Sequence, residues 1–245
     1  MVPTAATITI MAIPTTDAAP IELPLFIWLS PAFPVGAFAY SHGLEWAAEA
    51  GDIRDAASLL SWLQDLCDFG APRSDSVLFS AAYRAALACD WPRLGELNDL
   101  AVALANSLER RLETTQQGGA FVTAARAAWD CEALAQLGGA DRTVAYCAAV
   151  AAAAAGHTIR LEAALPAFAL SVFSNLVSAA VRLSVIGQTD GQRVLAALAP
   201  RVAAMAATAA GADLAQDEAA LGGCAFRSDL AALQHETQYS RLFRS

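Results

Sequence analysis

The stretch Ser30–Trp46, SPAFPVGAFAYSHGLEW, interrupts the helical pattern of the chain and sets how the segments on either side connect. Pro31 and Pro34 fix the backbone φ angle and lack an amide donor, so a helix is not expected to run through them. Gly36 adopts backbone angles that other residues avoid. We therefore predict a rigid turn that leads into a short helix beginning near Ser41.

The same turn carries three aromatic side chains, which belong to Phe33, Phe38 and Tyr40. A turn of this composition is either an ordinary buried loop or a binding element that presents its aromatic residues to a partner. The turn alone does not separate the two interpretations.

Outward from the turn, the chain has the composition of a helical protein. It contains 245 residues, of which 56% are hydrophobic and 16% are charged. Much of the hydrophobic content is alanine, which favours helices and buries little area per residue. We find no β pattern beyond the first residues, no repeat and no long linker. We predict one all-α domain over residues 23–245, a single compact bundle of about eight to ten helices, preceded by a mobile leader over residues 1–22.

Leucine spacing and glycines predict several helix boundaries. The leucines from Leu97 to Leu112 recur at helical spacing and predict one apolar stripe. We expect Gly118–Gly119 to weaken or break this helix. Asp141 is predicted to begin an alanine-rich helix that ends at Gly156.

Residues 159–186 form the predicted central helix, and residues 163–181 within it carry no charge. This length reaches the threshold for a membrane span. The serines and the asparagine inside the run, and the charged residues that frame it, favour a buried helix of a bundle instead. We predict Gly187 as its C-terminal cap, and Thr189 with Gln192 as the capping box of the next helix.

The charged residues exclude several functions. The net charge is −9, and all fifteen basic residues are arginine. Without lysine, the chain lacks an essential group of P-loop nucleotide hydrolases and of Schiff-base enzymes. The acidic balance argues against a nucleic-acid partner. The first basic residue is Arg54, which does not fit a secretory signal, and the five scattered cysteines suit a reducing compartment. We predict a cytoplasmic protein with no membrane partner.

No catalytic group of residues can be assembled from the sequence. There is no G-x-S-x-G motif and no cysteine in a recognisable nucleophile setting. His42 and Glu45 stand three positions apart, so they could form a metal or proton-transfer pair, or simply the polar start of a helix. We favour the polar start, because a metal site needs three or four ligands. We predict no catalytic residue, no metal ligand and no cofactor.

The last residues, His235–Ser245, differ from the acidic remainder of the chain. They read HETQYSRLFRS and combine aromatic side chains with arginines. Tyrosine and arginine are frequent anchors of protein interfaces. We predict a docking tail that orders on binding, and the alternative is a tail packed on its own domain.

Three separated segments resemble the urease accessory protein F (UreF) family. They are Ser30–Glu45, Asn175–Gln192 and His235–Ser245, and the resemblance runs in register over residues 23–245. It implies an all-helical, dimeric, non-enzymatic chaperone. Such proteins work with the accessory protein UreD (also called UreH) and the nickel-carrying GTPase UreG to load nickel into apo-urease.

The resemblance also implies a bridging role and a set of partner-binding residues. The tail from His235 to Arg244 and the turn from Arg182 to Gly191 are expected to face UreD. The stretch from Pro34 to Glu45, with Tyr40 foremost, is expected to contribute both to the core and to the surface that faces UreG. The individual candidates are Pro34, Gly36, Phe38, Tyr40, Ser41, Glu45, Arg182, Gln188, Thr189, Asp190, Gly191, His235, Glu236, Tyr239, Ser240, Arg241, Phe243 and Arg244.

Two other functions stay open beside the scaffold. One is a regulator of GTP hydrolysis in UreG, either an activator that inserts an arginine or a fidelity factor. The other is a direct nickel-binding module that uses His42, Glu45 and His235. We rank the nickel module last because imidazole and soft ligands are too few.

Overall fold

The computed structural model describes residues 22–138, 142–214, 218–221 and 223–245. These residues form eleven α-helices and two short 3₁₀ helices, and no strand occurs among them. The prediction of an all-α bundle is confirmed. The helix count exceeds eight to ten because three of the helices are only six residues long. Nearly all of the predicted leader lies outside the described residues.

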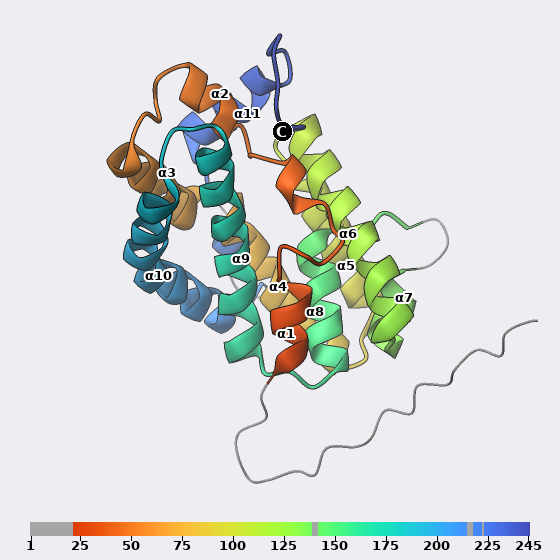
Figure 1. Cartoon of the computed structure of the whole chain (residues 1–245). Helices are drawn as coiled ribbons and strands as arrows, with labels where there is room; N and C mark the ends of the chain where they lie inside the picture. Colours follow the sequence, from red (N-terminus) through yellow and green to blue (C-terminus); the bar gives the residue numbers. More distant parts are fainter. Residues whose placement is uncertain (1–21, 139–141, 215–217, 222) are drawn as a thin grey trace, which may run out of the picture.

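The helices follow one another with short connections (Figure 1). Their bounds are α1 Leu23–Trp28, η1 Ala37–Ala39, α2 Leu44–Glu49, α3 Ala56–Phe69, α4 Ala71–Leu87, α5 Trp91–Ala103, α6 Leu108–Ala128, α7 Glu132–Leu137, α8 Tyr146–Gly156, α9 Leu161–Arg182, α10 Gln188–Gly211, η2 Glu218–Leu221 and α11 Phe226–His235.

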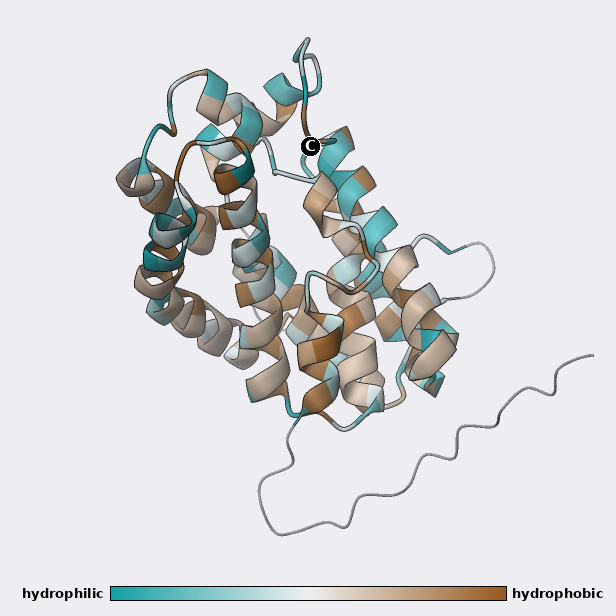
Figure 2. Cartoon of the chain, in the orientation of Figure 1, coloured by the Kyte–Doolittle hydropathy of each residue, from teal (hydrophilic) through white to brown (hydrophobic). Residues whose placement is uncertain are grey.

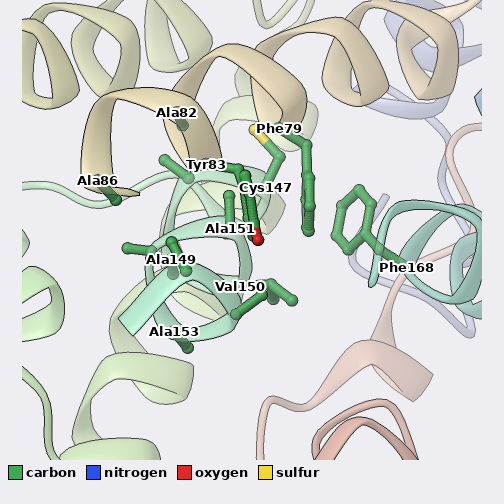
Figure 3. Packing of buried hydrophobic residues seen from close by; sticks show 14 of the residues in the cluster. Phe79, Ala82, Tyr83, Ala86, Cys147, Ala149, Val150, Ala151, Ala153 and Phe168 are labelled. Atoms are coloured by element: carbon green, nitrogen blue, oxygen red, sulfur yellow. The ribbon is translucent and has the colours of Figure 1, made fainter. Parts of the chain in front are cut away.

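The alanine-rich helix α8 is the buried centre of the larger core. Every residue from 147 to 155 is buried. Figure 2 shows α8 as mainly hydrophobic, whereas the part of α6 near the C-terminus is hydrophilic. Small alanine side chains let α4 lie close to α8, and aromatic side chains fill the space beside them (Figure 3). Among these, the rings of Phe79 in α4 and Phe168 in α9 lie 5.1 Å apart.

Helix α9 joins this core to a second one. Its first half contributes Leu165 and Phe168 to the α8 core, and its second half contributes Phe173 and Leu176 to a core shared with α2, α3 and α10. The helices α9 and α10 are long and apolar enough to cross a membrane by length and composition alone. Because α9 packs between two cores, the prediction of a buried central helix is confirmed.

Two predictions about α5 and α6 are wrong. The leucine stripe is divided, because α5 ends at Ala103 and α6 begins after Ser107, whose side chain accepts a hydrogen bond from the backbone amide of Arg110 at 3.1 Å. The pair Gly118–Gly119 does not break α6. A β carbon on Gly118 would overlap the backbone carbonyl of Val144, so this glycine lets α6 pass close to the start of α8.

The predicted caps around α8, α9 and α10 are also wrong. Helix α8 begins at Tyr146, and Asp141 lies outside the described residues. Gly187 is the N-cap of α10, not the C-terminal cap of α9. Thr189 and Gln192 therefore lie inside α10, where they form no capping box. A glycine between two helices fits either role, and local sequence did not distinguish them.

Candidate partner-binding site

Segments that are far apart in sequence meet at the end of the molecule where the C-terminus lies (Figure 1). We call residues 236–245 the C-terminal tail. The backbone amide of Ser41 donates to the carbonyl of Ser245 at 2.6 Å, and the amide of Arg244 donates to the carbonyl of Ala39 at 2.7 Å. The tail is therefore hydrogen-bonded to the N-terminal turn Ser30–Trp46.

The end of α9 holds the same two segments. The guanidinium of Arg182 donates to the carbonyl oxygen of Phe38 and lies 4.4 Å from the ring centroid of Phe243. Two turns earlier in α9, the side-chain amide of Asn175 donates to the carbonyl of Tyr40 at 3.2 Å. Parts of all three segments that carried the family resemblance are thus in contact.

A glycine permits the close approach of α2 and α11. Helix α2 begins at Leu44, not at Ser41, and its N-cap is Gly43 with φ of 74°. A β carbon on Gly43 would overlap the backbone of Ala232 in α11. This left-handed glycine sets the first turn of α2 directly against α11.

Glu45, in the first turn of α2, binds the tail. Its Oε1 accepts a hydrogen bond from the backbone amide of Leu242 at 2.6 Å, and its Oε2 accepts one from the amide of Phe243 at 2.9 Å. The same Oε2 lies 3.1 Å from Nε2 of His235. A carboxylate at a helix N-terminus also benefits from the helix dipole.

His235 is fully buried between two carboxylates. Its Nδ1 lies 2.6 Å from Oε2 of Glu109, while its Nε2 faces Glu45. Each ring nitrogen of His235 thus lies within hydrogen-bond distance of a carboxylate oxygen. Arg241 donates to the other oxygen of Glu109 at 2.8 Å. α2, α6, α11 and the tail therefore share one ionic network.

A second buried network lies beside the first. Nε2 of His42 is 2.7 Å from Oε1 of Glu113, and Arg110 contacts both side chains. Burial alone would raise the pKa of Glu113, but Arg110 and His42 outweigh it and lower the pKa to about 2. Burial, with help from Arg110, lowers the pKa of His42. The hydroxyl of Ser245 donates to Glu113 at 3.3 Å, which joins the tail to this network.

Asp75 in α4 lies at the edge of the second network. Its carboxylate is 3.8 Å from the guanidinium of Arg110. Burial raises the pKa of Asp75 to about 6, because Arg110 is too distant to compensate fully for lost hydration.

The predicted partner-binding residues divide into three groups by exposure. The buried ones are Tyr40, Ser41, Glu45, Gly191, His235 and Phe243. The half-buried ones are Gly36, Asp190 and Glu236. The exposed ones are Pro34, Phe38, Arg182, Gln188, Thr189, Tyr239, Ser240, Arg241 and Arg244. The buried group holds the turn, the helices and the tail in place, and the exposed group is available to a partner.

The turn from Arg182 to Gly191 reaches the tail only through Arg182. At its other end, Asp190 forms an exposed ion pair with Arg193 at 2.8 Å. Gly191 is buried against Val177 of α9. The start of α10 is therefore positioned by α9 and not by the tail.

Sequence reasoning missed Glu109, Arg110 and Glu113 of α6. All three side chains are buried, whereas Leu108 and Leu112 of the predicted apolar stripe are 76% and 41% exposed. Helix α6 thus faces inward with its charged side at this end. The available signal was that Glu109 and Glu113 stand four positions apart and share a helix face. His42 and Glu45, predicted as a polar helix start, are buried: His42 contacts Glu113 and Arg110 of this face, and Glu45 is linked to it through His235.

The described side chains of the site bind one another through hydrogen bonds and ion pairs. Across residues 22–138, 142–214, 218–221 and 223–245, no group of three or more histidine, cysteine, aspartate or glutamate side chains could hold a metal ion. His42 and His235 belong to separate networks, so the three residues considered as nickel ligands do not converge on one point.

Comparison with known proteins shows the family. The UreF family profile matches residues 53–199. A urease accessory protein UreF from Methylobacterium radiotolerans is 54% identical over 224 residues, which cover 91% of this chain and 96% of that protein. One from Xanthobacter autotrophicus is 54% identical over 234 residues, covering 94% and 93%. One from Azorhizobium caulinodans is 51% identical over 236 residues, covering 96% and 100%. The chain belongs to the UreF family.

Proposed function

We propose that this chain is a non-catalytic urease accessory protein. In this role it is a scaffold that bridges UreD (UreH) and the GTPase UreG while nickel is inserted into apo-urease. It acts as a homodimer in the cytoplasm. The names of its relatives support the urease accessory role. The choice of partners follows from the family resemblance of its three segments.

The observation that carries the proposal is the meeting of these segments at one end of the molecule. Buried residues of these segments, such as Glu45 and His235, contact each other and hold the segments in place. Exposed members such as Phe38, Tyr239 and Arg244 then project from a fixed support. A surface that is ordered before binding avoids part of the entropy cost of association. This supports a docking surface that is already formed in the free protein.

Retention of UreD tests the proposed role of the tail. Tyr239 is fully exposed, so Tyr239→Ala removes a candidate contact without disturbing the buried networks. We expect UreD affinity to fall by about tenfold or more, as for a moderate interface anchor. The matched control is Leu87→Ala, an exposed residue at the end of α4. Unchanged retention by the Tyr239 variant would contradict a docking tail.

Single-turnover GTP hydrolysis by UreG separates the scaffold from a regulator. A scaffold recruits UreG without changing the hydrolysis rate, whereas an inserted arginine raises it by orders of magnitude. The rate is measured with and without this chain and UreD. A large acceleration would replace the scaffold with the regulator.

A further inference from the structure

We propose that the exposed face formed by Phe38, Arg182, Arg244 and Gln116 binds an acidic surface of a partner protein. We call it the arginine face. The inference rests on the proposed function, and it adds the chemistry of the partner that this end of the molecule recognises.

The segments that build the arginine face are almost free of acidic residues. They are residues 30–43, 112–119, 171–182 and 239–245, and they contain one acidic residue, Glu113. Its side chain is buried and already paired with Arg110. The complete chain carries 24 acidic residues and a net charge of −9. The arginine face is therefore a basic area on an acidic protein, and such an area attracts an acidic partner.

The two arginines of this face do not pair with carboxylates in the described part of the chain. Arg182 donates to the backbone carbonyls of Phe38 and Ser178. Arg244 donates to the side-chain carbonyl of Gln116 at 3.4 Å. These neutral acceptors orient the guanidiniums but leave their charge uncompensated. A carboxylate from a partner can bind such a group in bidentate geometry.

Other exposed arginines of the chain do form ion pairs. They include Arg93 with Glu96, Arg126 with Asp130, Arg193 with Asp190 and Arg201 with Asp68. Arg84, which donates to the backbone carbonyls of Ala210 and Ala212, is an exception outside this face. The arginine face differs in that two such arginines contact one short segment: Arg182 binds the carbonyl of Phe38, and the backbone amide of Arg244 binds that of Ala39.

An apolar anchor accompanies the charge. The ring of Phe38 is 69% exposed, and its backbone is fixed because its own carbonyl binds Arg182. In the tail, Leu242 is 65% exposed. Aromatic and arginine side chains together are typical of the centre of protein interfaces.

A protein surface fits the arginine face better than a second copy or a nucleic acid. In a two-fold dimer through this face, arginines would lie opposite arginines. A nucleic acid would be repelled by the net charge of −9, and two unpaired arginines are few for phosphate binding.

The test measures the dissociation constants of purified UreD and UreG at 50 and 300 mM salt. The variants are Phe38→Ala and Arg244→Glu, since the Arg244 side chain is exposed and its neighbours are the neutral side chains of Gln116 and Tyr40. For at least one partner, we expect each variant to weaken binding by about tenfold at low salt. The wild-type affinity should fall with salt, and this dependence should shrink in Arg244→Glu. The control is Arg93→Glu, which changes the same charge on exposed α5.

The outcomes distinguish the two proposals. If the wild type binds neither UreD nor UreG, the proposed function fails, and the partner assignment fails with it. If the wild type binds but Phe38→Ala and Arg244→Glu bind equally well, the docking surface lies elsewhere and only this inference is wrong. A 20-base-pair duplex DNA serves as a third probe, and tight binding that Arg244→Glu abolishes would overturn the choice of a protein partner.

Discussion

Helix α8 and the end of the molecule that holds the C-terminal tail both contain many buried side chains, but these side chains differ in polarity. Around α8, nearly all buried side chains are apolar, and every residue from 147 to 155 is covered. At the tail end, apolar side chains such as Phe243 are buried together with charged or ionisable ones, among them Glu45, Glu113 and His235. Figure 2 shows the same contrast along the ribbon.

The two regions serve different purposes. Apolar packing is non-directional, so the α8 core stabilises the fold without fixing the position of any one polar group. Buried charges must each meet a partner with the right geometry, because an unpaired buried charge is costly. The tail end therefore has a specific arrangement of its segments, which a docking surface needs. This arrangement is lost if any one of the paired side chains is removed.

The largest expected effect is in the apolar region. Ala152→Leu adds three carbon atoms to a fully buried position of α8, where no space exists for them. Overpacking of this kind should lower the free energy of unfolding by about 3 kcal/mol. Chemical denaturation measures the change. Ala203→Leu on the exposed side of α10 is the matched control. If both substitutions cost the same small amount, α8 is not a tightly packed centre.

The second effect separates the two regions directly. Glu45→Gln keeps the shape of the side chain but removes the charge that His235 and two tail amides contact. Local opening of the tail should become easier by about 2 kcal/mol, so tail amides should exchange roughly thirtyfold faster while α8 stays protected. Hydrogen exchange by mass spectrometry measures both regions in one experiment.

Glu49→Gln is the control for this charge change, because Glu49 is exposed and contacts the tail only through Gln238. It should alter tail exchange much less. Equal acceleration in the tail and in α8 would mean that the two regions open together, and the contrast between them would be lost.

The third effect concerns pH, and it belongs to the polar region alone. The pKa of Asp75 is about 6 in the folded protein and ordinarily 3.8, so the folded state holds this proton more tightly. The contribution of Asp75 to stability is thus fully present below about pH 4 and lost as the pH rises to about 6. Asn cannot titrate, so Asp75→Asn should be more stable than the wild type above pH 6.

Unfolding free energies of both proteins at pH 4, 5, 6 and 7 test this effect. The difference between them should grow over that range. Asp190→Asn, at a half-buried position in the first turn of α10, controls for the loss of one charge. A constant difference between Asp75→Asn and the wild type would show that Asp75 titrates normally.

The sequence predicted the apolar region better than the polar one. The uncharged run 163–181 was expected to be buried in the bundle because it is apolar along its length, and α9 does contribute to both cores. In contrast, Glu109 and Glu113 could not be placed from α6 alone. Glu113 pairs with Arg110 of the same helix but also contacts His42, which is distant in the chain. Glu109 contacts His235 and Arg241, both of which are distant in the chain. Local periodicity therefore assigned Leu108 to the core and left the carboxylates out of it.

The candidate site shows the same limit. The sequence was enough to identify its three segments. It was not enough to predict which residues of these segments are buried and which are exposed. Tyr40 and Ser41 are buried because Gln116 and Ser245 reach them from distant parts of the chain. The tail was ambiguous between docking and packing on its own domain. It packs through Phe243 and Ser245, while Tyr239 remains exposed.

The central claim is that the tail is fixed on the domain before any partner binds. The most direct measurement is amide hydrogen exchange at Leu242 and Phe243 by NMR on the isolated protein, because Glu45 accepts a hydrogen bond from each of these amides. We predict exchange at least a hundredfold slower than in an unstructured peptide, which corresponds to about 3 kcal/mol of protection. Exchange at the peptide rate would show a free tail and contradict the claim.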